Sequence, residues 1–213
     1  MNEVSGPARR TVGVRTGGRS ERVVAAVLEA TLAELARVGF AAFRLEEVAE
    51  RAKVAKTTLY RRWPTKAQLV VDALRSTAHD ETIPDTGDLR HDLLLMIERT
   101  QKKMSTPHGR AIARVITTEG ADKDNVELEA LCRELRDEIR VKRRQVVTQA
   151  QEAGRLPPDA DADLLLDAIY GGIMGRLLRF GERTDRPTCE RIIDLVVTGA
   201  EHGGGAAPPK KRK

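Results

Sequence analysis

One short run of the chain carries the side chains best suited to binding a partner. Between Lys56 and Lys66 the sequence combines cations, hydroxyl groups and Tyr60. Cations and hydroxyls bind phosphates, and hydrogen-bond donors near the start of a helix can read base edges in the major groove of DNA. Taken singly, Tyr60 could be a packing residue and the Arg61–Arg62 pair could be solvated. The arrangement is therefore more informative than any one residue in it.

Three short helices would position this run. Apolar residues recur every three or four positions over residues 20–38, 45–52 and 55–63, which predicts three amphipathic helices. Gly39 would end the first helix as a left-handed cap, and Pro64 would end the third. The tight turn between the second and third helices is typical of a helix-turn-helix, whose second helix enters the major groove.

The net charge of +5 is unevenly divided along the 213 residues. Residues 1–79 have 14 Lys+Arg and 8 Asp+Glu, a balance of +6, whereas the balance is −5 for residues 80–202 and +4 for residues 203–213. A basic head on an acidic body favours a protein that presents one end to nucleic acid, although an unevenly solvated surface would give the same division. Four of the six aromatic residues lie in the head, so a ligand pocket in the body would be mainly aliphatic.

The second and third predicted helices resemble a known family. Its members are similar to this chain at Gly39-Phe40, at Leu45-Glu46-Glu47-Val48-Ala49 and from Val54 to Lys66, a run that contains Thr-Leu-Tyr followed by Arg-Arg-Trp-Pro-Thr-Lys. These residues resemble the DNA-binding domain of TetR-family transcriptional regulators, and the Arg-Arg-Trp-Pro form resembles one subgroup of that family. With weaker motifs in the C-terminal part, the resemblance covers residues 19–201.

The resemblance implies an all-α fold of about nine helices, with a helix-turn-helix domain at residues 19–79 and a helical regulatory and dimerisation domain at 80–202. It further implies a homodimer that binds a pseudo-palindromic double-stranded DNA operator in the bacterial cytoplasm and is released by a small-molecule effector. Repression is expected, although activation would follow if the operator lay elsewhere. Lys56, Thr57 and Tyr60 would lie nearest the bases, while Thr58, Arg61, Arg62, Lys66 and Arg44 would contact phosphates.

The chain departs from the family pattern at three positions. Arg44 and Ala55 stand where a Ser or Thr usually caps the second and third helices, and Lys53 stands where a Gly usually makes the turn. A missing cap costs about 0.5–2 kcal/mol, and a positive φ at Lys53 would cost about 1 kcal/mol. These substitutions are expected to weaken the local structure without abolishing it.

Lys66 has a predicted role that does not depend on the family. Thr65 followed by Gln68 three residues later indicates a capping box at the start of a fourth helix. A helix N-terminus with free N–H groups and a lysine is suited to binding phosphate. The fourth helix would continue to about Ala78 and link the head to the body.

Five further helices are predicted in the acidic body. Asp88 would open one that ends before Pro107, a shorter one would end at Gly120, and Asp124 with Glu127 would cap a long one reaching Gly154. The last two would span about 159–178 and 187–200. Because the first of these is apolar on nearly all sides and holds three glycines, both are expected to form a two-fold four-helix bundle with their copies. The expected dimerisation residues are Leu166, Ile169, Ile173, Leu177, Ile192, Ile193 and Val196.

The effector cannot be identified from the sequence. Met96, Met104, Tyr170 and Met174 are candidate pocket residues because flexible thioethers and a phenol can line an irregular cavity, although core packing would use the same residue types. A basic cluster of Arg140, Lys142, Arg143 and Arg144 could bind an anionic ligand. Glu138, four residues before Lys142, favours a solvated face with ion pairs instead.

Several classes of function lack support in the sequence. Cys132 and Cys189 do not have the spacing of a zinc site or a disulfide framework, and the four histidines share no metal spacing, so no metal or cofactor is expected. No catalytic arrangement favours an enzyme, and no apolar stretch is long enough to cross a membrane. A helical adaptor whose basic head binds acidic protein partners remains the alternative function.

Composition predicts that both ends of the chain are flexible. Residues 1–18 indicate a disordered basic arm, and residues 203–213 a flexible basic tail. The segment from Pro209 to Lys213 resembles a nuclear-localisation signal. An accessory DNA contact, a coincidence and an added tag are all compatible with that match.

Overall fold

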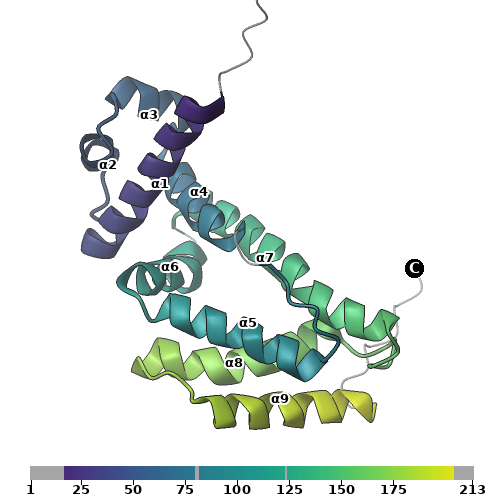
Figure 1. The fold of residues 1–213 in the computed structure, drawn as a ribbon. Coiled ribbons are helices and arrows are strands. Elements are labelled where there is room, and N and C mark those ends of the chain that lie inside the picture. Colours follow the sequence, from purple (N-terminus) through teal and green to yellow (C-terminus); the bar gives the residue numbers. More distant parts are fainter. Residues whose placement is uncertain (1–16, 80–81, 123, 204–213) are drawn as a thin grey trace, which may run out of the picture.

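The computed structural model describes residues 17–79, 82–122 and 124–203, and within them all regular secondary structure is helical (Figure 1). The described residues form nine α-helices and one short 3-10 turn, which confirms the predicted all-α fold. The helices are α1 (Gly17–Val38), α2 (Leu45–Arg51), α3 (Lys56–Arg62), α4 (Lys66–His79), α5 (Leu89–Met104), α6 (Pro107–Thr117), α7 (Val126–Glu152), α8 (Ala162–Phe180) and α9 (Arg186–Glu201), with the 3-10 turn η1 at Glu119–Ala121. None of these helices has the length and apolar character needed to cross a membrane.

The basic arm and tail predicted at the two ends fall largely outside the described residues. Helix α1 begins at Gly17, so residues 17 and 18 belong to a helix rather than to the arm. Its end is as expected, because Gly39 has a φ of +72° and its N–H donates to the carbonyl of Leu35 at 2.9 Å.

The head of the molecule, α1 to α4, is built around an aromatic core. Phe40, Phe43 and Trp63 are 3–5% exposed and pack with apolar residues of all four helices. The indole Nε1 of Trp63 donates to Asp72 of α4 at 2.9 Å. Burial of large rings and a satisfied indole N–H fix the orientation of α3, whose C-cap is Trp63.

Side-chain caps set the helix boundaries in the body. Asp88 accepts from two N–H groups at the start of α5, and Asp161 does the same for α8. Helix α7 is capped by Asn125, whose side chain accepts from Leu128 N–H at 3.3 Å. The predicted cap at Asp124 is therefore wrong by one residue, because the amide oxygen of Asn125 accepts the capping bond.

Helix α4 joins the head to the body. It packs against α1 on one side and α7 on the other, and Figure 1 shows α4 running beside α7. Arg75 of α4 donates to Glu138 of α7 at 2.9 Å and to Asp72 at 2.8 Å. The head core also includes Leu128 and Leu135 of α7. A displacement of α4 would therefore change side-chain contacts in both the head and the body.

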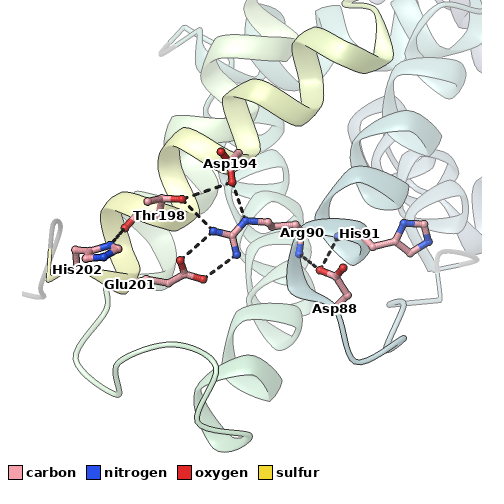
Figure 2. A network of polar contacts seen from close by, with 7 residues as sticks. All are labelled: Asp88, Arg90, His91, Asp194, Thr198, Glu201 and His202. Carbon is pink, nitrogen blue, oxygen red and sulfur yellow. Dashed lines mark hydrogen bonds and ion pairs between the residues drawn. The ribbon is translucent and has the colours of Figure 1, made fainter.

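A second core lies between α5, α7, α8 and α9, and a polar network closes one edge of it (Figure 2). Arg90 of α5 binds Glu201 of α9 through two hydrogen bonds of 2.8 and 2.9 Å. It also donates to Asp194 at 3.0 Å and to Thr198 at 3.0 Å. One guanidinium thus fixes the C-terminal half of α9 to the start of α5.

Candidate nucleic-acid interface and internal cavity

Helix α3 presents one buried side and one exposed side. Leu59 is 1% exposed and points into the core. The six predicted contact residues of α3 are all exposed, namely Lys56, Thr57, Thr58, Tyr60, Arg61 and Arg62. We call this exposed set the α3 face. Arg44, which precedes the first turn of α2, is exposed as well.

Tyr60 is held by an acidic residue of the neighbouring helix. Its hydroxyl donates to Glu46 Oε1 at 2.5 Å, and Glu46 lies in the first turn of α2. This hydrogen bond lowers the pKa of the Glu46 carboxyl and raises the pKa of the Tyr60 phenol. The bond to Glu46 could not be predicted from the sequence, since no local pattern marks a bond between side chains 14 positions apart.

The turn between α2 and α3 contains a lysine in the left-handed conformation. Lys53 has a φ of +55° and is the only non-glycine residue with a positive φ in the described part of the chain. Its N–H donates to Glu50, and that of Val54 donates to Ala49, which together form a Schellman motif. Neither Arg44 nor Ala55 makes a side-chain capping bond, as expected from their types.

Lys66 lies beside the α1–α2 loop, at the start of α4. Its ammonium donates to the Phe40 carbonyl at 3.3 Å and lies 4.4 Å from the centroid of the Phe40 ring. Thr65 accepts from Gln68 N–H at 3.3 Å, as predicted, but the side chain of Gln68 binds Glu127 instead of completing the box. A phosphate at this helix terminus would share Lys66 with the Phe40 carbonyl.

A cavity of about 620 Å³ lies between α4, α5, α6, α7 and α8. This volume lies within the usual range for small-molecule sites. Met104, Tyr170 and Met174 line it, whereas Met96 is 7% exposed in the second core and is absent from the lining. The physical reason is that Met96 lies one turn before Thr100, where α5 is already packed against the body core. Tyr170 is the single aromatic residue of the described lining. The mainly aliphatic character of the cavity is therefore as expected.

The basic cluster of α7 is only partly a solvated face. Arg144 pairs with Asp163 of α8, and Arg140 donates to Asp167 at 2.9 Å. Arg140, Lys142 and Arg143 nevertheless line the cavity. The cluster thus forms ion pairs with acids of α8, whereas Glu138 pairs with Arg75 of α4. The same face of α7 also closes one wall of an internal space.

Most of the residues predicted for dimerisation lie inside the protomer. Five of the seven are only 0–6% exposed, namely Leu166, Ile169, Ile173, Leu177 and Ile193. Ile192 and Val196 are half-buried. This prediction is corrected because α8 and α9 bury these side chains against α5 and α7.

The outward sides of α8 and α9 are also apolar. Leu164 and Leu195 are 54% and 75% exposed. Gly171, Gly172 and Gly175 of α8 have open space where a Cβ would stand. At Gly171 and Gly175 this space belongs to the cavity that they line, whereas Gly172 lies outside the lining. Periodicity alone could not distinguish the outward side of α8 from the inward one, since α8 is apolar on both.

Two family descriptions match the chain. "Bacterial regulatory proteins, tetR family" matches residues 27–73, and "Tetracyclin repressor-like, C-terminal domain" matches residues 83–196. The first match includes α2 and α3, and the second includes α5 to α8 and most of α9.

Curated relatives are similar over most of the chain. An uncharacterized HTH-type transcriptional regulator of Bacillus subtilis, YdeS, is 30% identical over 84% of this chain and 88% of its own length. The HTH-type transcriptional regulator AqdR of Rhodococcus erythropolis is 29% identical over 88% of this chain and 89% of its own. Among solved structures, the TetR family transcription regulator SCO0332 is 31% identical with a TM-score of 0.66, covering 88% of this chain and all of the other.

Proposed function

Because the chain belongs to the TetR family of bacterial transcriptional regulators, we propose that it is a repressor that binds a pseudo-palindromic operator as a homodimer. The observation that carries this proposal is the α3 face, six exposed cationic and hydroxyl-bearing residues on a helix whose other side is fixed by Leu59 and Trp63. We assign base contacts to Lys56, Thr57 and Tyr60. Phosphate contacts are assigned to Thr58, Arg61, Arg62, Lys66 and Arg44.

The proposal also includes a subgroup, a cellular location and two domains. The Arg-Arg-Trp-Pro run at the end of α3 supports assignment to a subgroup of the family that has this form. A repressor acts where the chromosome is, so the protein works in the bacterial cytoplasm. Residues 19–79 form the DNA-binding domain and residues 80–202 the regulatory and dimerisation domain.

Dimerisation would use the outward sides of α8 and α9. Exposed Leu164 and Leu195, together with Gly172 of α8, support close packing of these helices against their copies. Gly172 lowers helix propensity by about 1 kcal/mol, and close approach of a partner helix would offset that cost. A dimer would place two α3 helices in successive major grooves.

The cavity is the proposed effector site, and α4 is the route from it to α3. Leu74, Thr77 and Ala78 of α4 line the cavity together with residues of α5 to α8. A ligand that prefers one position of α4 would change the separation of the two α3 helices and release the operator. A strong population shift needs a preference of about 5.5 kcal/mol between the two states.

The test is selection of bound duplexes from a random pool, followed by binding measurements over a range of salt concentrations. Tyr60→Ala and Lys66→Ala should lose about tenfold or more in affinity while remaining folded dimers. Arg133→Ala, an exposed cation of α7, is the matched control and should bind as the parent does. Equal DNA binding by all four proteins would overturn the site assignment, and capture of acidic proteins without duplex binding would favour an adaptor.

A further inference from the structure

The arginines that line the cavity differ in their hydrogen-bond and ion-pair partners. Three arginines line it: Arg136, Arg140 and Arg143. Arg140 pairs with Asp163 and Asp167, and Arg136 donates to the carbonyls of Ile116 and Gly120. These two guanidiniums are therefore satisfied by the protein.

Arg143 is held in a different way. Its guanidinium carbon lies 4.1 Å from the centroid of the Tyr170 ring, so the planar cation stacks on the aromatic face. Among the described residues, no carboxylate lies within ion-pair distance of it. Stacking occupies the face of a guanidinium and leaves the N–H groups at its edge able to donate.

The acids of the cavity cannot easily neutralise Arg143. Asp163 is bound by Arg144 and Arg140, Asp167 by Arg140, and Glu138 by Arg75. Asp137, the remaining acid of the lining, is exposed. Since a partly buried cation gains most from an anion that offers two acceptor oxygens, the cavity has an unmet preference for a carboxylate.

The remaining residues of the cavity wall determine which apolar group such a ligand would carry. Apart from Tyr170, the apolar lining is aliphatic or thioether, and it includes Met104, Ile139, Met174 and Leu178. A flexible aliphatic chain fits such a wall better than a stacked aromatic system, which would need facing rings.

We propose that the effector is an amphipathic carboxylate, whose aliphatic body fills the cavity and whose carboxylate accepts from Arg143 at the face of Tyr170. This rests on the proposed function, because it names the ligand class of the proposed effector site. It also assigns a role to the α7 basic cluster, whose neighbouring acids made a solvated face the expected outcome.

The experiment measures ligand binding to the full chain by calorimetry, without DNA. The probes are octanoate, decanoate and dodecanoate, each with the alcohol and the alkyl phosphate of the same chain length. The parent should bind each carboxylate about tenfold or more tightly than its alcohol, since a charge-assisted bidentate pair is worth at least one factor of ten. In Arg143→Gln this preference should disappear, while alcohol binding stays within about twofold of the parent.

Arg133→Gln is the matched control, because Arg133 lies on the same helix, outside the cavity, and pairs with Glu129. It should keep the full preference for carboxylates. Equal binding of carboxylate and alcohol by the parent would overturn the proposal, as would binding of neither. An Arg143→Gln variant that loses both ligands equally, or tighter binding of the phosphate than of the carboxylate, would overturn it as well.

A failure of the proposed function can be told apart from a failure of this inference. Binding in these titrations requires no operator, so the preference for carboxylates stands or falls without DNA. If the chain binds carboxylates through Arg143 but no duplex from the random pool, the repressor assignment fails alone. If it binds a duplex but no carboxylate, the ligand class fails alone.

Discussion

At the scale of single residues, the hydroxyl of Tyr60 already has an acceptor in Glu46. A base that accepts from this hydroxyl must displace the carboxylate, which also repels the neighbouring phosphates. Glu46→Gln should therefore raise affinity for the selected duplex by about threefold, the size of effect expected for one screened surface charge. Fluorescence anisotropy at fixed salt checks this, with Glu47→Gln on the same turn as the control. Weaker binding by Glu46→Gln would instead mean that Glu46 orients Tyr60 for its contact.

Lys53 offers a second test at one residue, on stability. Its φ of +55° is costly for a side chain with a Cβ. Lys53→Gly should raise the free energy of unfolding by about 0.5–1 kcal/mol, since glycine removes the strain but adds entropy to the unfolded chain. Urea unfolding at neutral pH measures the change. Lys53→Ala keeps the strain and should gain nothing, and a gain of the same size in both variants would contradict the argument.

At the scale of helices, boundaries could be predicted where one residue type marks them. Gly39 ends α1 and Asp88 caps α5 as expected. The prediction was wrong at α7, because Asp124 and Asn125 are both good caps and only the folded backbone selects one. The six α3 residues could be placed on one surface because α3 has a single apolar side.

The same reasoning could not place residues on helices that are apolar all round. In α8 both the inward side, with Ile169, and the outward side, with Leu164, are apolar. Periodicity identifies the helix without saying which side meets the protomer and which remains open. Met96 was misplaced for a similar reason, since a core and a cavity wall use the same side chains.

The link between α5 and α9 gives a prediction on pH (Figure 2). Arg90 lowers the pKa of the Glu201 carboxyl, so the folded state binds this proton less readily than the unfolded chain does. The stabilisation that the Arg90–Glu201 ion pair gives to the folded state is therefore complete above the ordinary pKa of glutamate, about 4.3. It is lost as pH falls through the lower pKa that Glu201 has in the folded state. We expect Arg90→Gln to lower the free energy of unfolding by about 0.5–1 kcal/mol at neutral pH, a discounted value because both groups are partly exposed.

That difference between parent and Arg90→Gln should shrink from neutral pH to an acidic pH at which Glu201 is protonated in both states. Urea unfolding at the two pH values measures it. Arg191 is an exposed arginine of α9, the helix that holds Glu201. Arg191→Gln should change the free energy of unfolding little at either pH. A deficit in Arg90→Gln that persists undiminished in acid would show that Arg90 acts through packing of its alkyl chain and not through the carboxylate.

At the scale of the whole molecule, the proposed DNA binding and the proposed effector response would both depend on where α4 lies. It packs on α1 and α7, and its C-terminal turn forms part of the cavity wall. The head core itself extends into α7 through Leu128 and Leu135. Head and body therefore share side-chain contacts, and a ligand that changes the cavity can alter the position of α3 without a flexible linker.

The dimer proposed for the whole molecule makes the most demanding prediction, because the side chains involved are exposed in one protomer. Leu195 of α9 is 75% exposed, and a second copy would bury it. Leu195→Glu should shift the protein to monomers, since each interface would then bury two unpaired carboxylates, and operator affinity should fall with it. Val126→Glu is the matched control, an equally exposed apolar residue, 72%, at the start of α7. Sedimentation measures the mass of each variant, and circular dichroism verifies the fold. A dimeric Leu195→Glu, or a monomeric Val126→Glu, would show that the subunits meet through another surface.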